Sequence, residues 1–175
     1  DALGVKPIQI CSSLVSAQKR PRLYWTNIPG ACVPEDQGVL LQDVFSGQGE
    51  VINDHPVILE RSQASLKIKN ATAQGFLWAE HGDSVNLEVP NSQTRRGRVG
   101  KGKTNTLNTS CDVGVNWFGD LVRVTRHDLE RLQTLPRNFT NGISMNQARK
   151  AIGNGWTVDV IVHLLSGIKQ QLNSN

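Results

Sequence analysis

Apolar residues in the first thirty positions fall into two short runs that are typical of β-strands. Val5, Ile8 and Ile10 form the first run, and residues 23–28 form a second run that is rich in β-formers. A Pro-Gly pair, which is a strong turn signal, follows the second run. The pattern predicts two strands around a loop over residues 5–28.

Residues 31–120 alternate between short apolar runs and clusters of Gly, Asn and Pro. The apolar runs cover residues 39–45, 57–59, 75–79 and 85–89. Runs this short, separated by turn-forming residues, favour short strands and long loops, with a helical turn near residues 41–45. We expect residues 95–103, which are basic and rich in glycine, to form a loop.

Helix signals are concentrated after residue 120. Thr125 and Asp128 have the spacing of a capping box, with Asp in place of the usual Glu, and Pro136 closes the segment. Leu129 and Leu132 have the spacing of residues that face the core from this helix.

Two further helices are predicted in the last third of the chain. Ser144 and Gln147 form a second capping box, which starts a helix that Gly153 ends. We expect a last helix over residues 158–172, with Thr157 as its N-cap. Its apolar residues follow helical spacing: Val158, Ile161, Val162, Leu165, Ile168 and Leu172.

The composition is that of a chain able to build a modest core. Its 175 residues, 38% of them hydrophobic, suit one domain or a small domain with part of another. We expect no membrane span and no signal peptide, because the required apolar runs are absent. Cys11, Cys32 and Cys111 are odd in number and far apart, which argues against a disulfide framework and for a reducing compartment. Neither the cysteines nor the scattered histidines have the spacing of a metal site.

One segment accounts for the net charge of +4. No acidic residue occurs between Glu88 and Asp112, and without five basic residues in this interval the net charge would be −1. Those residues are Arg95, Arg96, Arg98, Lys101 and Lys103. A clustered basic excess favours a polyanionic partner such as double-stranded DNA. Five phosphate contacts would give a slope of roughly −4 to −5 in log K against log salt concentration.

Fewer residues would read bases. The arginines at 95, 96 and 98 can recognise guanine, and Asn91, Gln93 or Asn105 can recognise adenine. The sequence does not choose among them.

Three short motifs are ambiguous when taken singly. Gln18, Arg20 and Arg22 would share one face of an extended chain, either as an anion or base-edge site or as a solvated edge strand. Arg123-x-Thr125 fits an ordinary capped helix. Glycines flanking Asn154 at a helix N-terminus would expose backbone N–H groups to a polar ligand, or would form a plain interhelical turn.

Taken in order, the three motifs resemble the C-terminal motifs of the cytosine-5 DNA methyltransferase family, and phage and bacterial members most. These motifs are Q-x-R-x-R, then R-x-T near an R-L-Q-x-x-P helix, then G-N-x-x-x-V. Residues 105–110 are similar to the N-T-L-T-T-S-like element that often precedes the middle motif. The resemblance covers residues 3–30 and 104–165. It implies that residues 31–103 are the variable part of a target recognition domain.

The first motif would supply one wall of the catalytic pocket. By the resemblance, Arg22 matches the arginine that contacts O2 of the flipped cytosine and helps to position it. Arg20 matches the arginine that braces the pocket, and Gln18 matches the leading glutamine. Flipping the base costs a few kcal/mol, which contacts in the pocket must offset.

The later motifs would lie beside the cofactor and the recognition domain. By the resemblance, Asn154, Gly155 and Trp156 match positions next to S-adenosylmethionine (S-adenosyl-L-methionine). Arg123 and Thr125 match the motif that supports the recognition domain.

The resemblance also implies an α/β fold. The chain would be the C-terminal part of a Rossmann-like methyltransferase sheet with an inserted, irregular, mostly β target recognition domain. Residues 1–30 would end the catalytic domain, residues 31–143 would form the recognition domain, and residues 144–175 would return to the catalytic domain.

The groups that carry the family's chemistry are missing from the sequence. The nucleophile is a cysteine in a Pro-Cys loop, and no cysteine here follows proline. The Glu-Asn-Val motif that engages N3 of cytosine and the F-x-G-x-G cofactor loop do not occur either. We expect the chain to begin just after these motifs and to be inactive alone.

Two functional hypotheses remain open. The chain is either a methyltransferase part that works with an N-terminal methyltransferase subunit or segment, or a non-catalytic DNA-binding or regulatory module. Both place it in the cytoplasm of a bacterial or phage-infected cell. Without a partner, the first strand and the apolar face of the last helix would be exposed, so we expect poor solubility or self-association.

Overall fold

The computed structural model describes residues 4–172, and the side chains of residues 4–168. The chain is a mixed α/β structure with separate sheets of two, three and four strands. Every pairing between named strands is antiparallel. The predicted α/β class is therefore confirmed in its coarse form. Parallel strand pairs, which are typical of a Rossmann-like sheet, do not occur among the named strands of residues 4–172.

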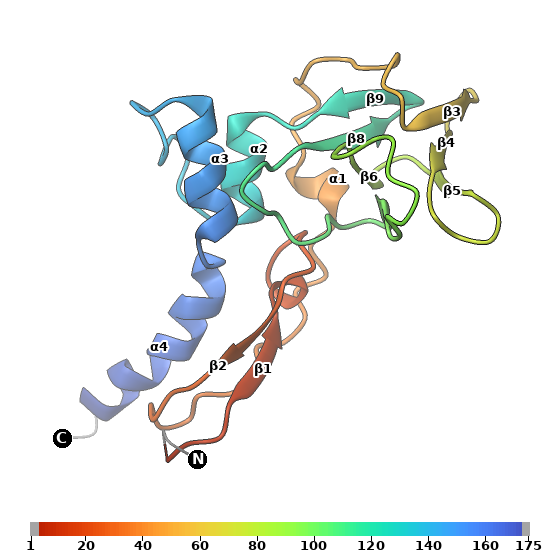
Figure 1. Cartoon of the computed structure of the whole chain (residues 1–175). Coiled ribbons are helices and arrows are strands. Elements are labelled where there is room, and N and C mark those ends of the chain that lie inside the picture. The colour runs from red at the N-terminus through yellow and green to blue at the C-terminus, as the bar shows by residue number, and fades with distance from the viewer. Residues whose placement is uncertain (1–3, 173–175) are drawn as a thin grey trace.

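The N-terminal hairpin packs against the last helix, and together they project from the rest of the molecule (Figure 1). Strand β1 (Ile8–Cys11) pairs with β2 (Pro21–Tyr24), and helix α4 (Val158–Leu172) lies beside them. A short 3-10 turn, η1 (Ser12–Leu14), follows β1. Ile10, Val15, Val160 and Leu164 form the core between hairpin and helix. The two predicted strands are thus confirmed, although the second begins and ends earlier than expected.

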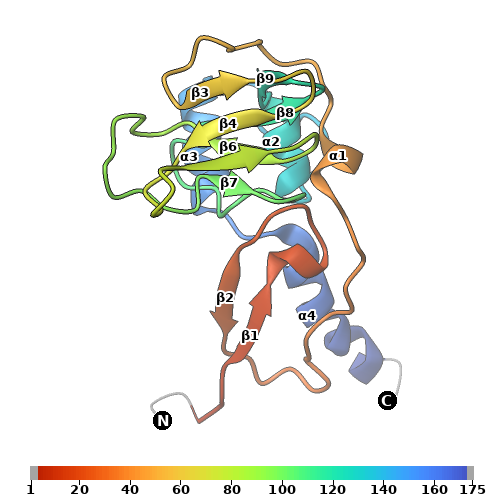
Figure 2. The same ribbon diagram turned by 90° about the vertical axis from the view of Figure 1, so that its right-hand side faces the viewer.

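The middle of the chain forms two sheets packed face to face (Figure 2). The first contains β3 (Ile58–Arg61), β4 (Leu66–Lys69) and β5 (Phe76–Ala79) in that order. The second contains β6 (Ser84–Asn86), β7 (Val99–Gly100), β8 (Val113–Trp117) and β9 (Asp120–Arg123), in the order β7-β6-β8-β9. Leu66 and Ile68 alternate with lysines along β4 and pack against Val85 and Leu121 of the second sheet. This region has more regular structure than the sequence indicated, since β7 lies inside the segment expected to be a loop.

Three helices cover the second sheet and complete its core. They are α1 (Leu41–Val44), α2 (Arg126–Leu132) and α3 (Met145–Asn154). Thr125 Oγ1 accepts a hydrogen bond from the backbone N–H of Asp128, and Ser144 Oγ accepts one from that of Gln147. Both predicted capping boxes are therefore confirmed, as is the burial of Leu129 and Leu132. Helix α3 ends one residue later than predicted, at Asn154.

Helix α4 begins where predicted, with Thr157 in the N-cap position, but the Thr157 side chain does not make the expected capping contact. The helix spans the expected residues, and the Thr157 hydroxyl donates to Gln133 Oε1 (2.8 Å). The first backbone N–H groups of α4 instead find acceptors in the residues that follow α2. Val158 N donates to Gln133 O (3.0 Å), and Asp159 N donates to Thr134 Oγ1 (2.9 Å). Tertiary partners have replaced the local cap.

The predicted apolar stripe of α4 is largely exposed, as expected for the chain without a partner, and another face of the helix is buried. Val160, Leu164 and Gly167 face the hairpin, whereas Val162, Leu165 and Ile168 of the predicted stripe are exposed. The Leu172 side chain lies outside the described residues. Gly167 permits the close approach, since a Cβ there would lie 2.3 Å from the Pro29 carbonyl oxygen. Within the described residues, no single helix is long and apolar enough to cross a membrane, and α3 and α4 pass that test only as a pair bent by 46°.

Candidate functional site

Gln18 joins three distant segments from a fully buried position. Its Nε2 donates to the Leu132 carbonyl oxygen (3.2 Å) and to Gln133 Oε1 (3.1 Å). Its Oε1 accepts a hydrogen bond from Leu107 N (3.0 Å). The first motif, the 105–110 element and the end of α2 therefore meet at one side chain.

Arg20 joins the same cluster to the glycine-rich turn after α3. Its Nη1 donates to Leu107 O (2.8 Å), and its Nη2 donates to Gly153 O and Gly155 O (both 2.9 Å). The side chain is only 4% exposed, and burial lowers its pKa, as does the charge of nearby Arg22. Its guanidinium therefore binds backbone carbonyl groups of two segments and holds those segments together. We call this cross-link, together with the one that Gln18 makes, the bracket.

Arg22 behaves differently from the other two members of its motif. It is exposed, and its Nη1 donates to the neighbouring Pro21 carbonyl oxygen (2.8 Å). With Trp156 it lines an open hollow of about 410 Å³ between β2 and α4. Of the three predicted catalytic residues, Arg22 alone has an accessible side chain.

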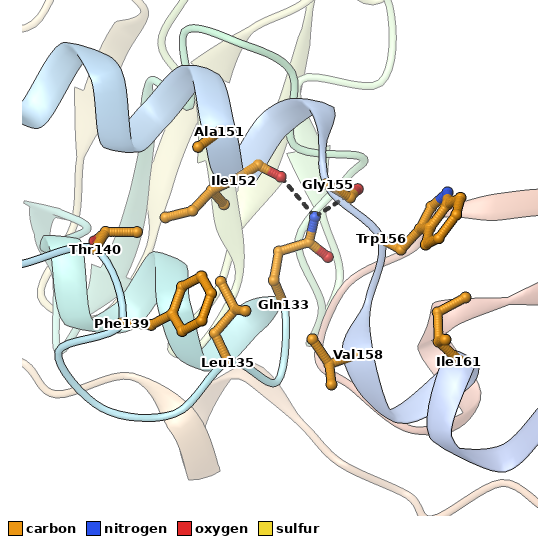
Figure 3. Close-up of a pocket in the computed structure, with 10 residues that line it drawn as sticks. All are labelled: Gln133, Leu135, Phe139, Thr140, Ala151, Ile152, Gly155, Trp156, Val158 and Ile161. Carbon is orange, nitrogen blue, oxygen red and sulfur yellow. Dashed lines mark hydrogen bonds between the residues drawn. The ribbon is translucent and has the colours of Figure 1, made fainter. Parts of the chain in front are cut away.

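Gln133 is a second buried side chain that joins several segments, and it was not among the predicted site residues. Its Nε2 donates to Ile152 O (2.7 Å) and Gly155 O (3.2 Å), as Figure 3 shows. Its Oε1 accepts from Gln18 and from Thr157. The signal that could have identified it is its place in the R-L-Q motif. Gln133 also lines an apolar cavity of about 290 Å³.

The Gly-Asn-Gly segment does not expose backbone donors, so the plain interhelical turn is the alternative observed. Asn154 is the last residue of α3, not the start of a helix, and Gly155 N donates to Ala151 O and Ile152 O. Gly153 permits a close contact, because a Cβ there would lie 2.0 Å from the Asn108 carbonyl oxygen. Asn154 and Trp156 are exposed, and Trp156 keeps 64% of its surface accessible.

Part of the basic segment has an internal role in place of the predicted DNA contacts. Arg98 is 1% exposed and donates to the carbonyl oxygens of residues 86, 88 and 89. Lys103 Nζ donates to Ser13 O (2.6 Å) and Ser16 O (3.3 Å), and Lys101 pairs with Asp83 (2.7 Å). Arg98 is therefore too buried to contact a DNA phosphate, whereas Lys103 is partly exposed and has two of its three donors bonded to carbonyl groups.

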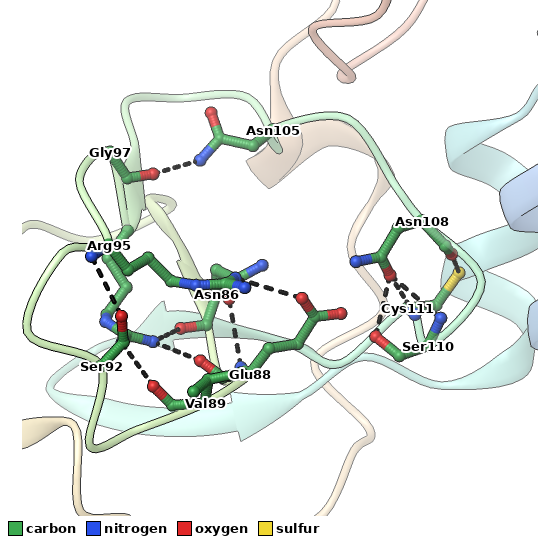
Figure 4. Close-up of polar contacts among 11 residues, drawn as sticks. Asn86, Glu88, Val89, Ser92, Arg95, Gly97, Asn105, Asn108, Ser110 and Cys111 are labelled. Carbon is green, nitrogen blue, oxygen red and sulfur yellow. Dashed lines mark hydrogen bonds and ion pairs between the residues drawn. The ribbon is translucent and has the colours of Figure 1, made fainter.

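Three of the predicted contacts other than Arg98 line one open, polar hollow of about 390 Å³, and Lys101 lies outside it. Arg95, Arg96 and Asn105 contribute to it, together with Lys19 and Thr106. Figure 4 shows Arg95 bonded to Asn86 Oδ1 (2.7 Å) and Glu88 Oε2 (3.1 Å), and Asn105 bonded to the Gly97 carbonyl oxygen (2.7 Å). Arg96 is exposed and uses only its Nε, toward Ala71 O (3.1 Å). We call this feature the basic hollow. Sequence analysis missed Lys19, which lies outside the basic segment.

The R-x-T pair supports the second sheet and α2. Arg123 forms ion pairs with Asp112 and, at 3.5 Å, with Glu50. Thr125 caps α2. Both side chains hold protein segments together.

The described residues bring together no metal-binding cluster, and their thiols differ in acidity. No group of three or more His, Cys, Asp or Glu side chains gathers there in a metal-binding arrangement. The three cysteines are free thiols, and burial raises the pKa of Cys111 to about 11. Burial opposes ionisation of the Cys11 thiol, but hydrogen bonds with Ser13 and with the Arg20 backbone lower its net pKa. Comparison with known proteins adds no assignment, since no protein-family model and no curated protein matches the chain.

Proposed function

We propose that this chain is the DNA-reading, C-terminal part of a cytosine-5 DNA methyltransferase. With the missing N-terminal motifs, it would help to transfer a methyl group from S-adenosylmethionine to C5 of a flipped cytosine in duplex DNA. The observation that carries the proposal is the convergence of its motifs. Gln18, Arg20 and Gln133 link the three motifs and the 105–110 element in one hydrogen-bonded cluster.

Within this proposal, the buried residues of the first motif position the backbone, and the exposed residue contacts the flipped base. Gln18 and Arg20 fix the backbone that leads into β2, and Arg22 is held at the surface as the residue that contacts the flipped cytosine. The hairpin and α4 would be the last part of a Rossmann-like sheet, and the two packed sheets would be the target recognition domain.

The residues fit S-adenosylmethionine only as one side of a site. The exposed ring of Trp156 and the exposed Asn154 amide can contact an adenosyl group. The turn between them presents no free backbone N–H toward a carboxylate, because Gly155 N is already bonded. The cofactor supplies the methyl group, and its remaining contacts would come from the N-terminal partner.

The basic hollow would contact the DNA backbone. Lys19, Arg95 and Arg96 provide cationic side chains there, and Asn105 or an arginine is placed to reach a base edge. With three phosphate contacts instead of five, the expected salt slope is roughly −3.

An exposed apolar surface supports the need for an N-terminal partner. Leu23, Trp25, Trp156, Leu165 and Ile168 are each at least 42% exposed. The first four of these line the hollow beside Arg22. Exposed apolar patches of this kind mark interaction surfaces.

The test is complementation of methyl transfer. The full chain is mixed with an N-terminal segment carrying the Pro-Cys, Glu-Asn-Val and glycine-rich motifs, and transfer of labelled methyl groups to duplex DNA is measured. We expect activity only in the mixture. Arg22→Ala should lower it about 100-fold or more, while changing DNA affinity much less. Arg137→Ala, at another exposed arginine, is the matched control. A mixture that binds DNA and cofactor but never transfers a methyl group would refute the proposal.

The second candidate is a non-catalytic DNA-binding module. The basic hollow alone supports it, since contact with DNA phosphates there needs no catalytic group. It predicts tight duplex binding without a partner and no effect of S-adenosylmethionine on that binding.

A further inference from the structure

The outward face of the β3–β5 sheet carries basic and aromatic side chains in register. Lys67 pairs with Trp78, and Lys69 with Phe76, across the β4–β5 ladder. The four side chains therefore share one face, while the alternating positions of both strands are directed toward the core. Figure 2 shows this sheet at the surface with no helix in front of it. We call this surface the aromatic face.

The aromatic side chains are held in place but only half-buried. The Phe76 and Trp78 rings meet edge to face, with centroids 6.3 Å apart. Lys67 Nζ lies 4.5 Å from the Phe76 centroid and 5.8 Å from the Trp78 centroid, and 3.1 Å from Glu60 Oε2. The strands therefore present flat apolar rings and ammonium groups side by side.

The aromatic face is continuous with the basic hollow. Ala71, in the turn between β4 and β5, donates its N–H to Arg95 O (3.0 Å) and accepts from Arg96 Nε (3.1 Å). At the other end, Lys101 Nζ donates to Trp78 O (2.9 Å). Cationic groups thus border the rings on both sides. Of the nearby acids, Glu60 and Asp83 are each paired with a lysine, whereas Glu80, two residues after Trp78, is exposed.

We propose that the aromatic face binds an unpaired nucleic-acid strand. Its bases would stack on Phe76 and Trp78, and its phosphates would contact Lys69 and Arg96. The positive charge favours binding of a polyanion. The accessible rings favour a single strand, whose bases are unstacked and can pack on them. In a duplex the base faces are hidden between neighbouring base pairs, so a duplex uses only the charges. This site lies outside the proposed methyltransferase function and requires neither cofactor nor catalytic partner.

The test measures binding of the full chain to a labelled oligothymidylate by fluorescence anisotropy. Phe76→Leu and Trp78→Leu keep apolar bulk but remove the rings, and each should weaken binding roughly 5- to 100-fold. Lys69→Gln should reduce the salt slope by about 0.7. Phe139→Leu and Lys150→Gln, an exposed ring and an exposed charge near α3, should leave binding unchanged.

A folding control and a second oligonucleotide complete the test. Lys69→Gln changes an outward side chain and tests the face even if a ring variant folds poorly, which circular dichroism would reveal. An oligouridylate arm identifies whether RNA or DNA is preferred, and either result with ring-dependent binding supports the proposal. Binding of the duplex alone, or unchanged binding by all three face variants, would overturn it.

Discussion

Arg20 is a buried cation whose identified hydrogen-bond acceptors are all backbone carbonyl groups. Its planar guanidinium reaches carbonyl oxygens on two separate segments, at Leu107 and at the 153–155 turn. A lysine has a single terminal nitrogen and cannot match this fork. The sequence placed Gln18 and Arg20 on one face but could not show that they are buried, because the acceptors come from residues more than 85 positions away. It also could not separate the internal Arg98 from the accessible Arg96, because the carbonyl groups of residues 86, 88 and 89 gather around Arg98 only in the folded chain.

We expect Arg20→Lys to lower the free energy of unfolding by about 2–4 kcal/mol, because buried carbonyl groups lose their donors. Urea unfolding followed by circular dichroism measures this. Arg22→Lys, two residues away and exposed, should change stability by less than about 0.5 kcal/mol. Equal effects of the two substitutions would contradict the bracket role of Arg20.

At the scale of elements, local signals predicted the helices and several strands. The apolar runs at 57–59, 75–79 and 85–89 fall on β3, β5 and β6, whereas β4 and the β8–β9 pair were not predicted. The capping boxes of α2 and α3 lie within four residues of sequence, so they could be recognised directly. The β8–β9 hairpin was missed because its two-residue turn is Phe118-Gly119, with φ of 53° and 90°. Asn-Gly or Asp-Gly normally marks such a turn. Here His81 stacks on the Phe118 ring and accepts its N–H, which only the folded chain shows.

The loop after α2 should be sensitive to acid. Burial alone would raise the pKa of Glu130, but hydrogen bonds from the Thr140 hydroxyl and from the N–H groups of Thr140 and Asn138, with nearby His127, lower the net pKa below its usual value. A carboxyl whose pKa is depressed by folding contributes stability above its unfolded pKa and loses it as pH falls through the folded pKa.

We therefore expect the unfolding free energy to fall as the pH drops below about 4.3, the ordinary value for glutamate. Thermal unfolding of the protein and of Glu130→Gln, measured between pH 7 and pH 3, checks this. The variant should be less stable at neutral pH and lose less stability on acidification. If the stability of the protein and of the variant fell equally with pH, Glu130 would not be the group responsible.

At the scale of the whole molecule, the hairpin and α4 leave apolar side chains exposed. Exposure of Val162, Leu165 and Ile168 agrees with the expected open face of the last helix, whereas Ile10 is covered by α4, contrary to expectation. The sequence pattern identified the amphipathic helix, but it could not decide which of two apolar stripes packs internally. Gly167 decides this, because only a residue without a Cβ fits against Pro29.

We expect the isolated chain to self-associate through this surface. Sedimentation velocity over a range of concentrations should show species larger than a monomer, and Trp156→Ser with Leu165→Ser should return the monomer. Leu59→Ser, at an exposed leucine on β3, is the control. A wild-type chain that stays monomeric at every concentration would contradict this prediction.

The bracket formed by Gln18 and Arg20 has a consequence for synthesis on the ribosome. The partners of these side chains lie between residues 107 and 155, so the N-terminal hairpin emerges long before the groups that hold it. At translation rates of about 5–20 residues per second, this delay is roughly 7 to 27 seconds. During that time the nascent hairpin has neither α4 nor the motif cluster to cover it, and it is then most open to chaperones, to proteases or to capture by a partner made alongside it.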